Sequence, residues 1–263
     1  MNSKSYPHLL KRLSVVAASL CFVAISQTHA AVVVFDETFN YPNTAALQAA
    51  WTNVNGTGLA LGTNSFITTQ PYATTGNGLN SRSLSETVTE SWTLSFDVLQ
   101  NGTAQRGTWV GLFNAAGTQG YGVLWDTTAN TTTNPNGQVS IRKFNLSSAI
   151  SSWGENGTAI TSAANPGHSI QAVAPMADFV FSWNKVTGAL SLSVDGTAIL
   201  SVIDTSFSSF SQIYVKGNQL QYYDNISVTA VPEPSVASLL VGVFVVGIGG
   251  RLMRRKAGGR SAR

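Results

Sequence analysis

The sequence predicts an all-β domain, an antiparallel β-sandwich, between residues 31 and 230. Three observations lead to this prediction. Alternating apolar and polar residues recur in short runs, and turn-forming pairs, mostly Asn-Gly, separate these runs. No long amphipathic helix pattern is present, because only residues 43–51 have a helical character, over about two turns. About ten closely spaced strands without a long helix are typical of a sandwich.

The expected strands follow one another along this region. In residues 92–98 the apolar side chains all fall on one face of the strand, which places Trp92 in the core. Trp183 is expected in the core for the same reason. Asp195-Gly196 is expected to form a two-residue hairpin, since both of its central positions favour positive φ. The other strands are expected at 108–113, 121–126, 138–144, 179–183, 190–194, 198–203, 212–216 and 220–229.

Residues 1–30 have the order of a secretory signal peptide. Three cations precede an apolar stretch at 13–25, and the small residues Ala30 and Ala31 follow it. We expect export through the Sec machinery and cleavage by signal peptidase after Ala30. The only cysteine, Cys21, lies inside this segment; its lipidation is the lesser alternative, because Leu20 rather than a small residue precedes it. The exported chain would contain no cysteine, so its core must hold the fold.

The C-terminal region reads as a temporary membrane anchor. The apolar segment 236–250 would reach only about 23 Å as a helix, short of the hydrocarbon layer of about 30 Å. It has no polar face, which argues against a packed surface helix. A basic tail, 251–263, follows and is expected to stay in the cytoplasm, so that the domain faces outward. The cations that set this topology are Arg251, Arg254, Arg255 and Lys256.

The charge distribution separates trafficking from the domain. The whole chain has a formal net charge of +3. Residues 31–231, in contrast, contain six Lys and Arg side chains against eleven carboxylates, a net charge of −5. The basic charge therefore belongs to the two ends of the chain, and we expect no nucleic-acid partner.

The last residues resemble a known sorting signal. Val231-Pro232-Glu233-Pro234, a short apolar segment and an Arg-rich tail are similar to the PEP-CTERM signal of exported proteins in Gram-negative bacteria. The resemblance covers 231–263. It implies recognition by an exosortase, a membrane transpeptidase or protease that processes the chain near the motif, in bacteria that make extracellular polysaccharide. The prolines restrict φ and remove amide donors, so the segment stays open to an enzyme, with Glu233 as a substrate residue.

The domain itself resembles concanavalin A-like jelly rolls. Residues 35–39 are similar to their opening strand, 186–199 to a pair of strands joined by an Asp-Gly turn, and 222–228 to their closing strand. In this class the first and last strands often lie together. Asp36, Glu37 and Asp224 could then converge as oxygen ligands of a structural Ca²⁺. The alternative is that these are solvated carboxylates at strand ends, and no cofactor is certain.

No catalytic motif is recognisable. Related jelly rolls that cleave glycans carry a Glu-x-Asp-x-x-Glu string, which this sequence lacks. Glu86 and Glu90 would share one face of a strand and, with Asp97, are the candidate carboxylates of a glycan hydrolase or lyase. His168 is the only histidine after the signal peptide, and no Gly-x-Ser-x-Gly turn is present. We therefore expect a non-enzymatic protein.

Binding of polysaccharide is the function that the composition favours. Sugar rings stack on exposed aromatic side chains, and amide groups hydrogen-bond to sugar hydroxyls. Trp153, within the polar sequence SSWGENGT, is the first candidate for such a contact. Trp125, at the start of the Asn- and Thr-rich stretch 126–137, is the second. The expected protein is a cell-surface or biofilm-matrix β-sandwich associated with extracellular polysaccharide; a hydrolase or lyase and a purely structural role are the alternatives.

Overall fold

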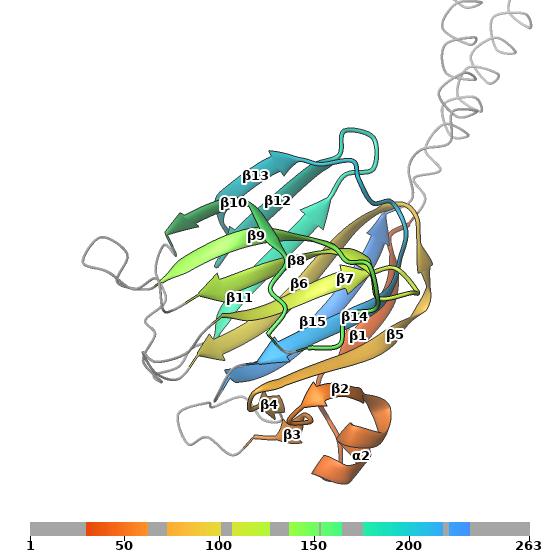
Figure 1. The fold of residues 1–263 in the computed structure, drawn as a ribbon, viewed down its shortest axis with the longest axis vertical. Helices are drawn as coiled ribbons and strands as arrows, with labels where there is room; N and C mark the ends of the chain where they lie inside the picture. The colour runs from red at the N-terminus through yellow and green to blue at the C-terminus, as the bar shows by residue number, and fades with distance from the viewer. Residues whose placement is uncertain are drawn as a thin grey trace, which may run out of the picture. The chain divides into compact units, whose positions relative to one another are not determined.

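Two antiparallel sheets pack face to face in the computed structural model, which describes residues 30–62, 73–100, 107–126, 137–152, 154–164, 176–217 and 221–231 (Figure 1). Residues Ala31–Val231 form one compact unit. The predicted all-β sandwich is confirmed.

The first sheet has eight strands in the order β13-β12-β11-β6-β15-β4-β3, and β1 pairs with β15 beside this path. The first and last strands of the domain are therefore neighbours, as the jelly-roll resemblance implies. The strands are β1 (Val32–Glu37), β3 (Ala60–Leu61), β4 (Ala73–Thr75), β6 (Ser91–Gln100), β11 (Ala177–Trp183), β12 (Ala189–Val194), β13 (Thr197–Ile203) and β15 (Gln221–Val231).

The second sheet has seven strands in the order β10-β9-β8-β7-β14-β5-β2. Its strands are β2 (Thr52–Gly56), β5 (Gly78–Val88), β7 (Thr108–Phe113), β8 (Gln119–Asp126), β9 (Gln138–Asn145), β10 (Thr158–Ala164) and β14 (Phe210–Gly217). The helix, α2 (Thr44–Ala50), lies where residues 43–51 predict one. Asn43 caps it by accepting a hydrogen bond from Ala46 N at 2.9 Å.

The core lies between the sheets and is rich in aromatic rings. Trp92 stacks edge-on against Phe181 with 5.1 Å between the ring centroids, and Phe96 lies parallel to Phe179 at 5.2 Å. Trp92 and Trp183 are 1% and 3% exposed, which confirms their expected place. Such rings bury a large apolar area in a chain that has no disulfide to hold it.

Each strand predicted from alternation is present. The Asp195-Gly196 hairpin also forms, with φ of 49° and 73° at its two central residues. The strands β2, β3, β4, β5 and β10 were not predicted. β5, of 11 residues, begins with four consecutive buried residues, because Leu79 and Ser81 lie under cover on the outer face while Asn80 points inward. The sequence of β5 therefore does not alternate between apolar and polar residues.

The described residues end at Val231, the first residue of the segment that resembles a sorting signal. Val231 ends β15 and is 41% exposed. Pro232, Glu233, Pro234, the segment 236–250 and the tail 251–263 lie outside the described residues, as do residues 1–29. Of the helices among the described residues, none has the length and apolar character needed to cross a membrane.

Candidate functional site

The outer face of the seven-stranded sheet carries a second apolar cluster. In β7, Trp109 and Phe113 point to this face, whereas Val110 and Leu112 point into the core. Apolar side chains on the outer side of a sheet require a cover. The buried members of this cluster are Leu79, Trp109, Phe113, Leu124, Phe144, Ile150 and Tyr214.

The cover is the connection between β9 and β10, residues 146–157, which we call the arch (Figure 1, green). Ile150 of the arch is 3% exposed, and its amide donates to Gly117 O at 2.9 Å. Trp109 Nε1 donates to Glu155 O, also at 2.9 Å. One half of the arch is thus fixed to the β7–β8 turn and the other half to β7 itself.

Two glycines allow the sheet to carry aromatic rings on this face. Gly111 of β7 and Gly122 of β8 lie opposite each other in the ladder. A Cβ at Gly111 would lie 2.7 Å from the backbone oxygen of Tyr121 and 3.3 Å from the ring of Phe113. A Cβ at Gly122 would lie 3.3 Å from the ring of Phe144. The absence of side chains here therefore makes room for the rings that support the arch.

A pocket of about 420 Å³ opens where the arch meets β9 and β10. It mixes polar side chains with apolar surface, and the arch supplies half of its lining. The lining residues are Lys143, Asn145, Leu146, Glu155, Asn156, Gly157, Thr158 and Ile160. Amide, hydroxyl, carboxylate and ammonium groups are all present, so the pocket can both donate and accept hydrogen bonds.

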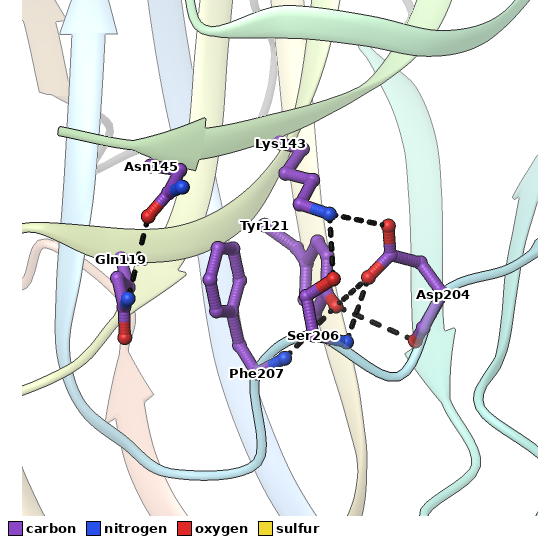
Figure 2. A network of polar contacts seen from close by, with 7 residues as sticks. All are labelled: Gln119, Tyr121, Lys143, Asn145, Asp204, Ser206 and Phe207. Carbon is purple, nitrogen blue, oxygen red and sulfur yellow. Dashed lines mark hydrogen bonds and ion pairs between the residues drawn. The ribbon is translucent and has the colours of Figure 1, made fainter.

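A polar network holds one wall of this pocket in place (Figure 2). Lys143 Nζ lies 2.9 Å from Asp204 Oδ2 and donates to Ser206 Oγ at 2.5 Å. Tyr121 OH donates to Asp204 Oδ1 at 2.5 Å. Asp204 follows β13, whereas Tyr121 and Lys143 belong to β8 and β9, so the network ties the two sheets together. Next to it, Gln119 Nε2 donates to Asn145 Oδ1 at 3.3 Å.

The network also sets the charge state of its members. Burial alone would raise the pKa of the Asp204 carboxyl, but the hydrogen bonds from Tyr121, Lys143 and Ser206 together hold that pKa well below its usual value. Burial, with the bond to Asp204, raises the pKa of Tyr121. Lys143 is the partner of Asp204 in this ion pair.

Two further cations lie on the outer face of the same sheet. Arg142 of β9 is half-buried, and its Nε donates to Ser140 Oγ at 2.9 Å. Lys216 of β14 is 2% exposed, and its ammonium donates to Asn156 Oδ1 of the arch. Burial lowers the pKa of Lys216 to about 8, with Asp126 opposing and Arg142 adding to the shift. Burial likewise lowers the pKa of Arg142, against the effect of Asp126.

Glu37, a predicted calcium ligand, has a different role. It is 4% exposed, and its Oε2 pairs with Arg82 at 2.5 Å. The same oxygen accepts from Trp51 Nε1 at 3.0 Å and Tyr41 OH at 2.7 Å, while Oε1 accepts from Phe39 N at 2.7 Å. Its two oxygens are therefore used by protein donors that fix β1, the helix region and β5.

The predicted calcium site is wrong in its arrangement. Asp36 is exposed while its neighbour Glu37 is buried, since successive side chains of a strand point to opposite faces. Asp224 lies on β15 across from Asp97 and accepts from Asn225 N at 2.9 Å. Among the described residues, no three His, Cys, Asp or Glu side chains gather in a way that could hold a metal ion.

The two tryptophans predicted to contact glycan have different outcomes. Trp125 is 2% exposed and packs against Phe179 in the core, with 5.8 Å between the ring centroids. Its ring cannot stack on a sugar, because the alternation of β8 turns it inward even though a polar stretch follows. Trp153 lies outside the described residues, so its contact stays a prediction.

The candidate catalytic carboxylates are dispersed. Glu86 is exposed on β5, and that strand ends at Val88, so Glu90 does not continue its face. Glu90 instead pairs with Lys185 at 3.0 Å. Asp97 of β6 lies on the outer face of the other sheet and accepts from Asn225 Nδ2 at 2.8 Å.

Arg142, Lys216 and Asn156 cannot be grouped from the sequence alone. The alternation of β9 and β14 turns the two cations away from the buried neighbours Ile141 and Val215. No local pattern, however, indicates that β9 and β14 lie in one sheet under a shared cover. That grouping depends on long-range pairing.

Solved structures of low sequence identity share this architecture. The fold is a jelly-roll sandwich of two antiparallel sheets. A Bacillus subtilis protein of unknown function with a galectin-like fold has a TM-score of 0.50 and 11% identity, over 76% of this chain and 98% of that one. The globular domain of Trypanosoma cruzi calreticulin has a TM-score of 0.50 and 10% identity, over 84% and 100% of the two chains. The Bacillus subtilis carbohydrate-binding module CBM66 has a TM-score of 0.49 and 15% identity, over 69% and 96%. No protein-family model matches the chain, and no curated protein does.

Proposed function

We propose that the domain is a non-enzymatic, polysaccharide-binding module of the cell surface or extracellular matrix. The observation that carries this proposal is the pocket of about 420 Å³ beside the arch. Its side chains form a mixed set of hydrogen-bond donors and acceptors, interrupted by the apolar groups of Leu146 and Ile160. A sugar ring presents the same mixture of hydroxyls and C–H surface, so the pocket and a sugar are chemically matched.

The position of the pocket supports binding of a long polymer. It lies at the edge of the sheet, where β10 is the terminal strand. Its walls come from a loop that is held by buried contacts and from a strand that is held by the Lys143–Asp204 pair. Binding residues on a loop with a rigid base can be aligned before the ligand arrives, which reduces the entropy lost on binding.

A glycan array with the purified domain tests this function. We expect measurable binding that falls about ten-fold or more for Asn145→Ala and for Asn156→Ala, since each removes hydrogen bonds to the sugar of about 1 to 1.5 kcal/mol. Ser182→Ala, on the outer face of the other sheet, is the matched control and should bind as the wild type does. Absence of binding to any glycan, including the polymer of the native producer, would overturn the proposal.

We also propose that the chain is exported and then processed. The N-terminal pattern with Ala30 and Ala31, the Val231-Pro232-Glu233-Pro234 motif and the basic tail together support the Sec machinery, signal peptidase and an exosortase as partners. The anchor at 236–250 would hold the domain at the outer side of the inner membrane until processing. Intact-mass analysis of the protein from its producer should show loss of both ends; a mass that corresponds to residues 1–263 would contradict export and processing alike.

A hydrolase or lyase is the second candidate, and one observation favours it. Asp178, Asp97 and Asp224 lie side by side on three neighbouring strands. Burial raises the pKa of Asp224 to about 6, with the charges of Asp97 and Glu37 adding to the shift. Burial also raises the pKa of Asp97. A carboxyl group with a raised pKa beside a second carboxyl group is an arrangement that glycosidases use. Release of reducing ends from polysaccharide by the wild type, lost in Asp224→Asn and Asp97→Asn, would establish this activity over the first proposal.

A further inference from the structure

The outer face of the seven-stranded sheet holds two cations that form no ion pair with a described carboxylate. Three other cations in the described part of the chain each form an ion pair: Arg82 with Glu37, Lys143 with Asp204 and Lys185 with Glu90. Arg142 and Lys216 instead donate to uncharged groups, the hydroxyl of Ser140 and the amide of Asn156. The two exceptions share one face of one sheet.

The strand register places these two cations at the two ends of one row of residues across the sheet. Lys216 lies opposite Trp109, Trp109 opposite Leu124, and Leu124 opposite Ser140, so the four form one row across β14, β7, β8 and β9. Arg142 starts two residues further along β9, and its Nε reaches back to Ser140 in that row. Arg142 therefore contacts the β9 end of this row and Lys216 occupies its β14 end, with the buried side chains of Trp109 and Leu124 between them. The charge of Arg142 also acts on Lys216.

Among the described residues, no ion pair balances the charge of these two cations. A buried cation loses its hydration and is normally compensated by a paired carboxylate. Asp126 is the described carboxylate whose charge acts on both Arg142 and Lys216, and one negative charge leaves the group of three with a net positive charge. This positive group belongs to a region whose net charge is −5. An anion supplied by a ligand would complete the compensation.

We propose that Arg142 and Lys216 bind the carboxylate of an acidic sugar, so that the polymer recognised by this domain is a uronate-containing polysaccharide. The half-buried Arg142 makes the direct contact, and Lys216 acts from beneath through its charge in surroundings of low dielectric constant. Asn156 links this anion site to the sugar pocket, because it accepts from Lys216 and also lines the pocket. The inference rests on the proposed polysaccharide-binding function and specifies its ligand.

An acidic polysaccharide fits this face better than a nucleic acid. Binding of a phosphate backbone requires many cations that follow the strand. Here two cations lie beside a carboxylate, in a domain with excess negative charge that would repel a polyanion of high charge density. A uronate polymer offers one carboxylate per sugar, together with the hydroxyls that the adjoining pocket can bind.

The first experiment compares two ligands that differ only in charge. Calorimetric titration with a hexauronate and with the same hexamer as its methyl ester should give an affinity about ten-fold or more higher for the acid, because the ester removes charge-assisted hydrogen bonds. Equal affinity for both would overturn the acidic-sugar inference while leaving the polysaccharide-binding function standing. Binding of neither the hexauronate nor any polysaccharide would overturn both. Binding of single-stranded DNA in place of every glycan would also overturn both.

The second experiment tests the two cations. We expect Arg142→Gln and Lys216→Met each to lower hexauronate affinity about ten-fold, with the affinity for the methyl ester little changed. Lys185→Met, which removes a cation paired with Glu90 on an exposed turn, is the control and should have no effect. Lys216→Met should keep or increase thermal stability, because a buried charge is replaced by an apolar side chain of similar length. If the Lys216→Met variant is stable and still binds the hexauronate more tightly than its methyl ester to the same degree, Lys216 is not part of the anion site.

The pH dependence provides a readout that a structural role would not give. Because burial brings the pKa of Lys216 to about 8, its charge is lost as the pH rises through that value. Asp126 and Arg142 are the other charged groups that act on it. Hexauronate affinity should thus fall between about pH 6.5 and about pH 9.5 in the wild type. It should stay level in Lys216→Arg, and the same fall in both proteins would contradict the assignment.

Discussion

At the scale of single residues, Glu37 shows how a carboxylate that looks like a metal ligand can instead organise a fold. Four donors converge on it, from Phe39, Tyr41, Trp51 and Arg82. Sequence alone placed Glu37 correctly at the first strand and close to the last. It could not show which oxygen lone pairs were already occupied, because the donors come from segments up to 45 positions away.

The role of Glu37 predicts a clear effect on stability. Glu37→Gln keeps the shape of the side chain but removes its charge, so the ion pair with Arg82 is lost. The amide NH2 group of the glutamine would also point at hydrogen-bond donors where the carboxylate had an acceptor oxygen. We expect the free energy of unfolding, measured in urea, to fall by about 2 kcal/mol, the typical effect for hydrogen bonds to a charged group. Asp36→Asn, at the exposed neighbouring position, should change it by less than about 0.5 kcal/mol. Similar effects in both variants would contradict the role of Glu37.

Asp224 predicts a pH dependence of stability. Its pKa is raised from 3.8 to about 6 in the folded protein, mainly by burial, so the folded state keeps a proton that the unfolded chain has released. The contribution of this group is therefore most favourable below pH 3.8 and declines as the pH rises to about 6. Unfolding titrations at several pH values should show a steeper decline for the wild type than for Asp224→Asn. Parallel curves would refute the raised pKa.

At the scale of secondary-structure elements, the arch is the feature that links packing to binding. Its single deeply buried side chain among the described arch residues is Ile150, which lies in the cluster with Trp109, Phe113 and Phe144. If that contact is lost, the arch loses its anchor while the two sheets keep their core. Pocket walls supplied by the arch, such as Asn156, would then lose their position.

Ile150→Ala tests this link. We expect a loss of about 2 to 4 kcal/mol in the free energy of unfolding from the deleted methyl groups and the cavity, less if the arch collapses onto the sheet. Polysaccharide affinity should fall together with it. Val186→Ala, at a residue that is 74% exposed in a turn, serves as the control and should alter neither quantity. If the Ile150→Ala variant is destabilised but binds polysaccharide with unchanged affinity, the position of the arch does not matter for binding.

Most elements could be predicted from local patterns, and the failures have a common cause. Strands such as β6, β9 and β12 have one face in the core and one face toward solvent, so apolar and polar residues alternate along them. β5 does not alternate because both of its faces are covered near its start. Trp125 was misplaced because its neighbours on the polar side were given more weight than the alternation of its own strand.

At the scale of the whole molecule, the sequence separates into two basic ends, which we propose to be trafficking signals, and an acidic sandwich between them. The residue order contains no recognisable catalytic motif in the domain, and the chain has no cysteine after residue 21. The residue order could not indicate where a ligand would bind, since Arg142, Asn156 and Lys216 are brought together by pairing between strands that are far apart in the chain. The site therefore appears only at the level of the complete sheet.

The most direct measurement is co-sedimentation of the wild-type domain with the purified extracellular polysaccharide of the organism that makes it, alongside Asn156→Ala and Ser182→Ala. Asn156 lines the sugar pocket and contacts Lys216, so its loss affects both parts of the site. We predict saturable binding for the wild type and for Ser182→Ala, and a reduction of about ten-fold or more for Asn156→Ala. Equal sedimentation of all three folded proteins, or of none, would contradict a binding site beneath the arch.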